Sequence, residues 1–396
     1  MTLDRVPCVV VIALAAALSG SPIGRAEPAR CAGDGRTDDS RCLSAYVAQH
    51  PTASLLAGAT YRVTHPIIIH GRRHISGKGA IIIGDGPMAS VLVLAGEDIE
   101  IDSLEIQNHS TLNKSVTIDV GARARWIRIR RCRFSGVRSV AALNINSPDV
   151  KYVVFDDNTV SEGVYGVLTN WRTAHLRHME INRNRMSGLS GDGIEINFPV
   201  LIPPHGTGDG AAAPSDIRIL ANAISAPRSQ SINSGFCIGI AGAHNVEIRD
   251  NTLSKCKWQG IHIEDTAADI RIIHNTIASV IGRQAGDKDG WKAYRDGILA
   301  LNSRRVTVQD NTLLDIPDTG VDFAYDATSF DAGEVICGNI MKRVGRYGIS
   351  VMAAVGQDVQ ALVGPVGSCS ANTIEAGEAP LHTNRPAGLV ATDPGQ

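Results

Sequence analysis

Several acidic residues and one histidine lie in or beside short apolar triplets, where they could carry acid–base chemistry. Glu195, His262 and Asp322 each stand between two apolar residues, and Asp192 and Glu264 lie within three residues of such a centre. Successive side chains of a β-strand point to opposite faces, so the central residue points away from the face that its neighbours bury. Two carboxyl groups across a glycosidic bond are the minimum for its hydrolysis, and histidine can act as a base or tune an acid. We predict that Glu195, Asp192, His262, Glu264 and Asp322 are catalytic.

The spacing of the triplets limits which of these residues can act together. If the triplets stack as neighbouring strands of a parallel sheet, each step is about 4.8 Å. Glu195 and His262 are then two strands apart, roughly 10 Å, whereas Glu195 and Asp322 are four strands apart. We expect Glu195 to act with Asp192, and His262 to act with Glu264 or Asp322. The alternative is that all five are solvated residues on an outer face.

Aromatic, amide and charged residues near the ends of the same triplets could hold a sugar. An aromatic ring offers an apolar face, and polar groups fix the orientation of a ligand. For Trp258 and Trp291 the alternative is packing inside a loop. The predicted substrate-binding residues are Tyr165, Trp171, Asn197, Lys257, Trp258, Trp291, Arg295 and Asp296.

The strands that would hold these side chains belong to an internal repeat. A triplet with two apolar positions is followed by a turn that ends in asparagine, and this unit recurs at intervals of 24 to 38 residues. Such short strands bury their apolar sides only by stacking on the next repeat, which pairs them in parallel. The sequence therefore predicts an all-β, single-domain, right-handed parallel β-helix, since the leucine consensus of a leucine-rich repeat and the register of a β-sandwich are missing. The recurrent asparagines are Asn158, Asn184, Asn222, Asn251, Asn275, Asn311 and Asn339.

The asparagines are expected to lie in a file at equivalent corners of successive coils. Asparagine tolerates a left-handed backbone and can pass a side-chain amide hydrogen bond to its neighbours at the strand spacing of about 4.8 Å. Two repeats are longer than the others and contain insertions, at residues 198–215 and 281–296. The first insertion follows the strand 194–196, and the second precedes the strand 298–300. Both strands belong to the sheet that would hold Glu195 and His262, so we expect the two insertions to form opposite walls of a groove over it.

The ends of the chain differ from the repeats. Residues 1–26 contain an arginine, a short apolar run and a small-residue cleavage site, which is typical of a signal peptide and too short to span a bilayer. Residues 27–50 form a predicted N-terminal cap with a helix over 37–49, begun by Thr37 or Asp38. Residues 51–375 form the β-helix, and residues 376–396, rich in Pro, Gly and Ala, should be disordered. We expect a secreted or periplasmic protein.

Export places the cysteines in an oxidising space. Cys8 is lost with the signal peptide, and seven cysteines remain. Cys132 falls where later coils have asparagine, so it is the expected buried, unpaired thiol. The expected disulfides are Cys31–Cys42 in the cap, Cys337–Cys369 on successive coils, and, by the same logic, Cys237–Cys256.

Three segments near the N-terminus carry a resemblance to a known group. Residues 33–40 (Gly-Asp-Gly-Arg-Thr-Asp-Asp-Ser), 55–63 with its Gly-Ala-Thr-Tyr strand, and 75–79 with its Gly-Lys-Gly turn resemble the opening of the pectate-lyase-like β-helix superfamily. With the repeats, the likeness runs from about residue 31 to 375. It implies the β-helix fold and an active site on the sheet built by the second strand of each coil. Members include pectate and alginate lyases, polygalacturonase-like hydrolases, epimerases, tailspike depolymerases and non-catalytic surface proteins.

The motifs of individual activities in that superfamily are incomplete here. Gly191-Asp192-Gly193-Ile194 only weakly resembles the first polygalacturonase motif, and the Asp-Asp and Arg-Ile-Lys motifs are absent, as is the epimerase Asp-Pro-His. Lys257, Arg283, Lys288 and Arg295 border the expected groove without forming the lyase motif, and Asp287–Gly290 lacks two positions of a calcium loop.

These observations rank three functions. We expect first a glycoside hydrolase-like depolymerase, second a uronate lyase or C5-epimerase, and third a non-catalytic glycan-binding or surface protein. The expected partner is a polysaccharide or oligosaccharide. No cofactor or metal is predicted, with calcium expected only for a lyase. Lys and Arg number 38 against 40 Asp and Glu, which argues against a nucleic-acid partner. The sequence does not determine the oligomeric state.

Overall fold

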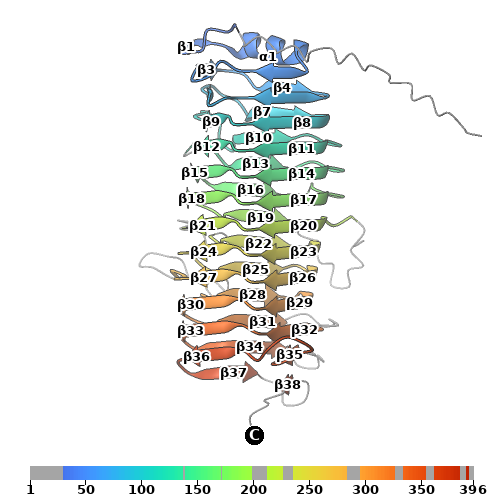
Figure 1. The fold of residues 1–396 in the computed structure, drawn as a ribbon, viewed down its shortest axis with the longest axis vertical. Helices are drawn as coiled ribbons and strands as arrows, with labels where there is room; N and C mark the ends of the chain where they lie inside the picture. Colours follow the sequence, from blue (N-terminus) through green and yellow to red (C-terminus); the bar gives the residue numbers. More distant parts are fainter. Residues whose placement is uncertain are drawn as a thin grey trace, which may run out of the picture.

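The chain winds into a column of parallel strands capped by one short helix (Figure 1). The computed structural model describes residues 30–136, 139–170, 172–198, 212–225, 235–282, 295–325, 333–353, 361–383 and 389–391. Within these ranges the strands form three sheets, called A, B and C here, of 13, 13 and 12 strands. Each coil passes through sheet A, then B, then C, so the predicted parallel β-helix is confirmed.

Sheet A contains the triplet that precedes each asparagine. In coil after coil two apolar side chains point inward, as Val153 and Phe155 do, and both are fully buried. Its strands are β2 (Thr52–Ser54), β5 (Arg73–Ser76), β8 (Glu97–Asp102), β11 (Arg125–Arg130), β14 (Lys151–Asp156), β17 (Arg177–Asn182), β20 (Ser215–Leu220), β23 (His244–Arg249), β26 (Ala268–Ile273), β29 (Arg304–Gln309), β32 (Glu334–Cys337), β35 (Ala361–Val363) and β38 (Leu389–Ala391).

Sheet B follows each asparagine and is missing from the predicted repeat, which contained only two strands per coil. Its middle strands bury few side chains, such as Leu253 or Ile277 alone, so they lack the alternation that marks a strand. They are β1 (Asp34–Asp38), β3 (Thr60–Val63), β6 (Ile81–Gly84), β9 (Glu105–Asn108), β12 (Arg133–Ser135), β15 (Thr159–Gly163), β18 (Arg185–Leu189), β21 (Ala223–Ser225), β24 (Thr252–Ser254), β27 (Thr276–Ala278), β30 (Thr312–Ile316), β33 (Ile340–Val344) and β36 (Thr373–Ala376).

Sheet C contains the triplets with central polar residues. In β19, Ile194 and Ile196 point into the core while Glu195 points outward. The strands of this sheet are β4 (Ile67–His70), β7 (Ser90–Ala95), β10 (Val116–Val120), β13 (Ala141–Ile145), β16 (Tyr165–Thr169), β19 (Ile194–Asn197), β22 (Ile238–Ala241), β25 (Ile261–Glu264), β28 (Ile298–Leu301), β31 (Val321–Tyr325), β34 (Tyr347–Ala353) and β37 (Ala379–Thr383).

The asparagine file between sheets A and B is confirmed. Asn251 Nδ2 donates to the Ile219 carbonyl at 2.8 Å and to Asn275 Oδ1 at 2.9 Å, and Oδ1 of Asn275 also accepts from the Asn251 backbone N–H. The same pattern runs down the file to Asn372. The left-handed residue of each corner is the one before the asparagine, such as Asp250 with φ 57°, and not the asparagine itself. The asparagines are therefore not needed for a left-handed backbone at these corners, and they hold the file together through the hydrogen bonds of their side-chain amides.

The ends of the column depart from the predicted boundaries. The cap helix α1 (Ser40–Gln49) begins after Asp39 and not at Thr37 or Asp38, because residues up to Asp38 pair as strand β1. Strands β37 and β38 pair with the preceding coil inside the segment 376–396 that was predicted to be disordered. The predicted signal peptide lies outside the described residues. Within the described part of the chain, no helix is long and apolar enough to cross a membrane.

The predicted disulfides and the predicted free thiol of Cys132 are confirmed, whereas Cys8 lies outside the described residues. Disulfides join Cys31 to Cys42, Cys237 to Cys256 and Cys337 to Cys369. Cys132 is a buried free thiol, and burial raises its pKa to about 12. It occupies a place in the asparagine file, since its backbone N–H donates to Asn158 Oδ1 at 2.9 Å. A thiol held in its neutral form is unreactive, so Cys132 is a packing residue.

Candidate functional site

The outward-facing residues of sheet C form the predicted file. Strand pairing places Glu195 beside Gly239, Gly239 beside His262, and so on along the column. All seven members of the file are buried or half-buried, so none of them is a fully solvated surface residue. The file reads Leu168, Glu195, Gly239, His262, Leu299, Asp322 and Ser350.

Asp192 and Glu195 form a pair of carboxyl groups at one end of the site. Asp192 is 1% exposed and accepts hydrogen bonds from the backbone N–H groups of Gly235 and Phe236. Burial raises the pKa of Asp192, while a hydrogen bond from the Glu195 side chain and the nearby charge of His262 act in the opposite direction. A buried carboxyl group with a raised pKa keeps its proton to a higher pH than a solvated one.

Gly239 provides the space into which the Glu195 carboxyl group extends. A Cβ atom built at Gly239 would lie 2.3 Å from Glu195 Oε2 and 3.4 Å from Phe236 Cδ2. Any side chain here would push the carboxyl group aside. The missing side chain thus lets Glu195 extend along the column toward His262, its second neighbour in the file.

His262 and Glu264 form the other end of the site. His262 is 1% exposed, and its ring stacks on Phe236 with centroids 4.3 Å apart. Its Nε2 lies 3.1 Å from Glu264 Oε2, although without the angle of a hydrogen bond, and neither ring nitrogen is hydrogen-bonded to a described residue. The Glu264 side chain is 15% exposed and Glu195 is 9% exposed. These two glutamates are the members of the site that a ligand could reach.

A second acidic group lies farther along sheet C. Burial raises the pKa of Asp322 to about 6, although a hydrogen bond from Ser350 acts to lower it. Burial also raises the pKa of Asp296 well above its usual range, and the charges of Asp322 and Asp318 add to that increase. Arg346 Nη1 lies 3.4 Å from Asp318 Oδ1. The described interactions of Asp322 are with this group and not with His262, so the structure pairs His262 with Glu264. Asp318 and Arg346 are absent from the predictions because they lie in turns outside the repeated triplets.

The predicted substrate-binding residues divide by their burial. The ring of Trp258 is fully buried beneath the Lys257 ammonium group, 5.2 Å from its centroid, so it has no face open to a sugar and follows the loop-packing alternative. Lys257 and Asp296 are buried as well, whereas Tyr165, Asn197 and Arg295 are half-buried along sheet C or its edge. Trp171, Trp291 and most of both predicted insertions, 198–215 and 281–296, lie outside the described residues.

The described residues contain no group of three or more His, Cys, Asp or Glu side chains that could hold a metal ion.

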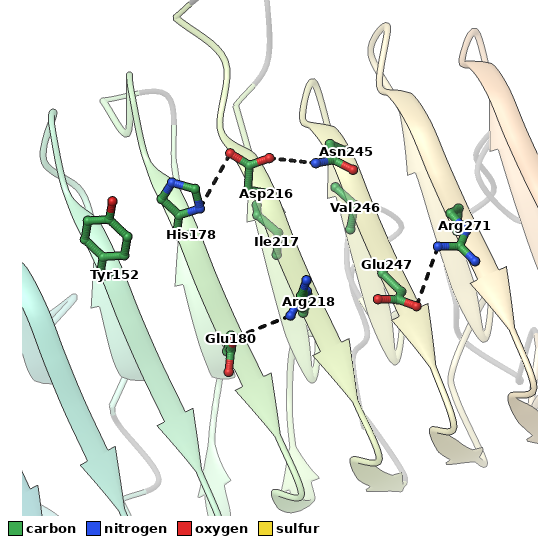
Figure 2. A pocket seen from close by; sticks show the side chains of 10 residues that line it. All are labelled: Tyr152, His178, Glu180, Asp216, Ile217, Arg218, Asn245, Val246, Glu247 and Arg271. Atoms are coloured by element: carbon green, nitrogen blue, oxygen red, sulfur yellow. Dashed lines mark hydrogen bonds and ion pairs between the residues drawn. The ribbon is translucent and has the colours of Figure 1, made fainter. Parts of the chain in front are cut away.

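A hollow of about 530 Å³ lies on sheet A, at a place that no prediction identified (Figure 2). Its upper row consists of the residues that directly precede the apolar triplets. That position is the only sequence signal that could have identified it. The lining includes Tyr152, His178, Glu180, Asp216, Arg218, Asn245, Glu247 and Arg271.

Comparison with known proteins places this geometry in a wider group. Residues 88–282 and 231–359 match the family described as "right handed beta helix region". The comparison with curated protein sequences gives no match. Among solved structures, the chain resembles the catalytic unit of a thermostable GH87 α-1,3-glucanase from Streptomyces thermodiastaticus, with a TM-score of 0.62, 12% identity, and coverage of 93% of this chain and 70% of that one.

Two further solved structures show the range of proteins that share the fold. The surface adhesin PfbA of Streptococcus pneumoniae has a TM-score of 0.60 and 13% identity, over 91% of this chain and 92% of that one. The A-module of the mannuronan C-5 epimerase AlgE6 from Azotobacter vinelandii has a TM-score of 0.51 and 13% identity, over 90% of this chain and 98% of that one. At such identities the likeness shows the fold alone.

Proposed function

This chain belongs to the right-handed β-helix family, and from that premise we propose that it is an exported protein that hydrolyses glycosidic bonds of a polysaccharide on sheet C. The observation that carries the proposal is that buried Asp192 and Glu195 lie on the same sheet as the close pair of His262 and Glu264. It combines a retained proton with a second carboxyl group, which are the two requirements for glycoside hydrolysis.

Each residue has a role that follows from its surroundings. Glu195, the more exposed member of its pair, delivers a proton to the leaving oxygen, and buried Asp192 holds that proton in place. Glu264 activates a water molecule or attacks the sugar, and His262 Nε2 lies 3.1 Å from its carboxyl group. Glu195 extends over Gly239, one strand before His262, so the two glutamate carboxyl groups lie about 5 to 10 Å apart. Glycosidases use separations in this range.

The comparisons and the disulfides support the wider setting. The solved structures with this fold include a glucanase, an adhesin and a mannuronan C-5 epimerase, so the same fold serves both enzymes and binding proteins. Three disulfides fit an oxidising, extracytoplasmic compartment. A uronate lyase or epimerase would use a basic residue at the substrate, and the buried position of Lys257 against Trp258 gives that alternative less support.

A second candidate function is glycan binding without turnover. The low exposure of Asp192 and His262 favours it, because both lie deep beneath the surface that a polymer would touch. Binding and catalysis are separable by experiment, since a binder retains its ligand without changing it.

Digestion of a polysaccharide panel with mass detection tests the proposal. The wild-type protein should release oligosaccharides with new reducing ends, and Glu195→Gln and Glu264→Gln should each reduce the rate by about 10²- to 10⁴-fold, the usual contribution of one acid or base. Glu375→Gln, at an exposed position of sheet B, is the matched control and should leave the rate unchanged. Unsaturated products that absorb ultraviolet light would indicate a lyase. Retention of full activity by both glutamine variants would exclude the assigned roles.

A further inference from the structure

Sheet A contains a second file of residues, set apart by its backbone. The second residue of each strand from β8 to β29 has a left-handed φ between 51° and 59°, and strand pairing skips this position on both sides. The side chains at these positions therefore project from the sheet in one continuous row. The file reads Asp98, Trp126, Tyr152, His178, Asp216, Asn245, Asp269 and Arg305.

Three consecutive members of the file are aromatic, where the backbone favours other residue types. Left-handed positions are occupied most readily by glycine, asparagine and aspartate, whereas a bulky ring there is strained. Trp126 and Tyr152 accept that strain, while histidine, aspartate and asparagine, which suit the position, occupy it in the next three coils as His178, Asp216 and Asn245. Backbone preference therefore does not explain the two large rings, which directs attention to their contacts on the surface.

The three rings stack on one another in an exposed row, which we call the platform. Trp126 and Tyr152 are 45% and 41% exposed, and their rings are 5.5 Å apart and inclined by only 6°. The Tyr152 and His178 rings are 4.7 Å apart and inclined by 10°. Two coil steps of about 4.8 Å give the platform a length of roughly 10 Å along the column.

Hydrogen-bonding groups of both charges continue from the platform. Figure 2 shows Tyr152, His178, Asp216 and Asn245 in one row across neighbouring strands, with a second, charged row beside it. In the second row Arg218 lies 3.9 Å from Glu180, and Arg271 lies 3.9 Å from Glu247. Contacts this long leave donors and acceptors open to a ligand. The second row is Glu180, Arg218, Glu247 and Arg271.

These features together fit a sugar chain better than other partners. The hollow measures about 530 Å³ and therefore has the size of a ligand site. A sugar ring has an apolar C–H face for the aromatic platform and a rim of hydroxyl groups for carboxylates, guanidinium groups and amides. The balanced charges of the second row give no attraction for nucleic acid. The aliphatic residues of the lining, Ile217 and Val246, are buried, so they offer no apolar patch to a protein partner.

We propose that the Trp126–Tyr152–His178 platform and the adjoining hollow on sheet A bind a polysaccharide chain along the column, separately from the site on sheet C. The choice of ligand class rests on the proposed function, but binding here requires no cleavage. A second binding site on another wall of the column would keep the protein attached to a polymer between encounters at sheet C, because two linked sites bind with an increased effective concentration.

The test is affinity electrophoresis of the full chain in gels that contain dextran, xylan, soluble β-glucan or alginate. The protein is used with Glu195→Gln, so that no polymer is cleaved. The informative variant is Trp126→Asn together with Tyr152→Asn. Asparagine suits the left-handed backbone, as Asn245 shows in the same file, so the variant should melt at the parent temperature or above it. Ile340→Asn, which removes an exposed apolar side chain from sheet B, is the matched control.

We expect at least one polysaccharide to retard the parent and the control equally, and the double variant to bind at least about tenfold more weakly. Equal retardation of the double variant would overturn the proposal, as would the absence of retardation of the parent in all four gels. Failure of the cleavage proposal would give a different result. The digestion assay would then be negative, while the polysaccharide would still retard the parent protein and bind the double variant more weakly.

Discussion

Replacing Gly239 by alanine tests whether the position of the Glu195 carboxyl group controls activity. The new Cβ atom would lie 2.3 Å from Glu195 Oε2, whereas ordinary contact begins at 3.4 Å, so the carboxyl group must move by about 1 Å. A misplacement of this size can lower the rate by about 10²-fold. The substitution leaves every proposed catalytic group chemically intact, so a loss would come from geometry alone.

Folding should tolerate the same substitution. Gly239 does not have a left-handed φ, and the atom it would displace is the end of a flexible side chain. Removing backbone freedom from the unfolded chain adds about 0.4 to 1 kcal/mol of stability at a compatible glycine. The melting temperature of Gly239→Ala should therefore remain near that of the wild type.

The assay measures both quantities on the same preparation: the rate of reducing-end release from the polysaccharide that the wild type cleaves, and the thermal melt. Gly121→Ala, whose nearest atom would be the Leu94 carbonyl oxygen at 3.3 Å, is the control and should preserve both. A Gly239→Ala protein with wild-type kcat/KM and an unchanged melt would refute the reasoning, because the carboxyl group would then have moved without consequence.

Three further predictions concern stability. Asn251→Leu leaves at least two buried backbone groups of neighbouring coils without partners and should cost roughly 2 to 6 kcal/mol, seen as a lower melting temperature, whereas Asn113→Leu, at an exposed position without a left-handed backbone, should have little effect. Cys132→Asn extends the asparagine file by one coil. One added hydrogen bond should increase the free energy of unfolding by about 1 kcal/mol and so raise the melting temperature. A lower melting temperature would show that the site cannot accept the amide. Burial raises the pKa of Glu334 from 4.5 to about 8, so the folded state retains a proton that the unfolded state loses, and stability should fall by about 1.4 kcal/mol per pH unit from pH 5 to 8. Glu334→Gln should flatten that slope in melts recorded across this range, and an unchanged slope would assign it to other groups.

The sequence alone determined the column and the order of its residues. The period of the apolar triplets requires stacking, since a single coil cannot bury its apolar side chains, and stacking aligns the triplet centres and the asparagines. The files that contain Glu195 and Asn251, and the disulfides Cys237–Cys256 and Cys337–Cys369, follow from that register. Strands of sheet B escaped prediction because a strand with few inward side chains has no alternation to detect.

Only the tertiary structure decided how deep each outward residue lies and what it touches. Alternation in the sequence separates the two faces of a strand, but it does not show that His262 and Trp258 are covered or that Tyr152 is exposed. The bond between Asp192 and Glu195 and the space above Gly239 depend on side-chain directions between coils. The left-handed row on sheet A depends on backbone angles. Burial, proton retention and backbone strain arise from contacts between coils, which a pattern within one coil does not contain.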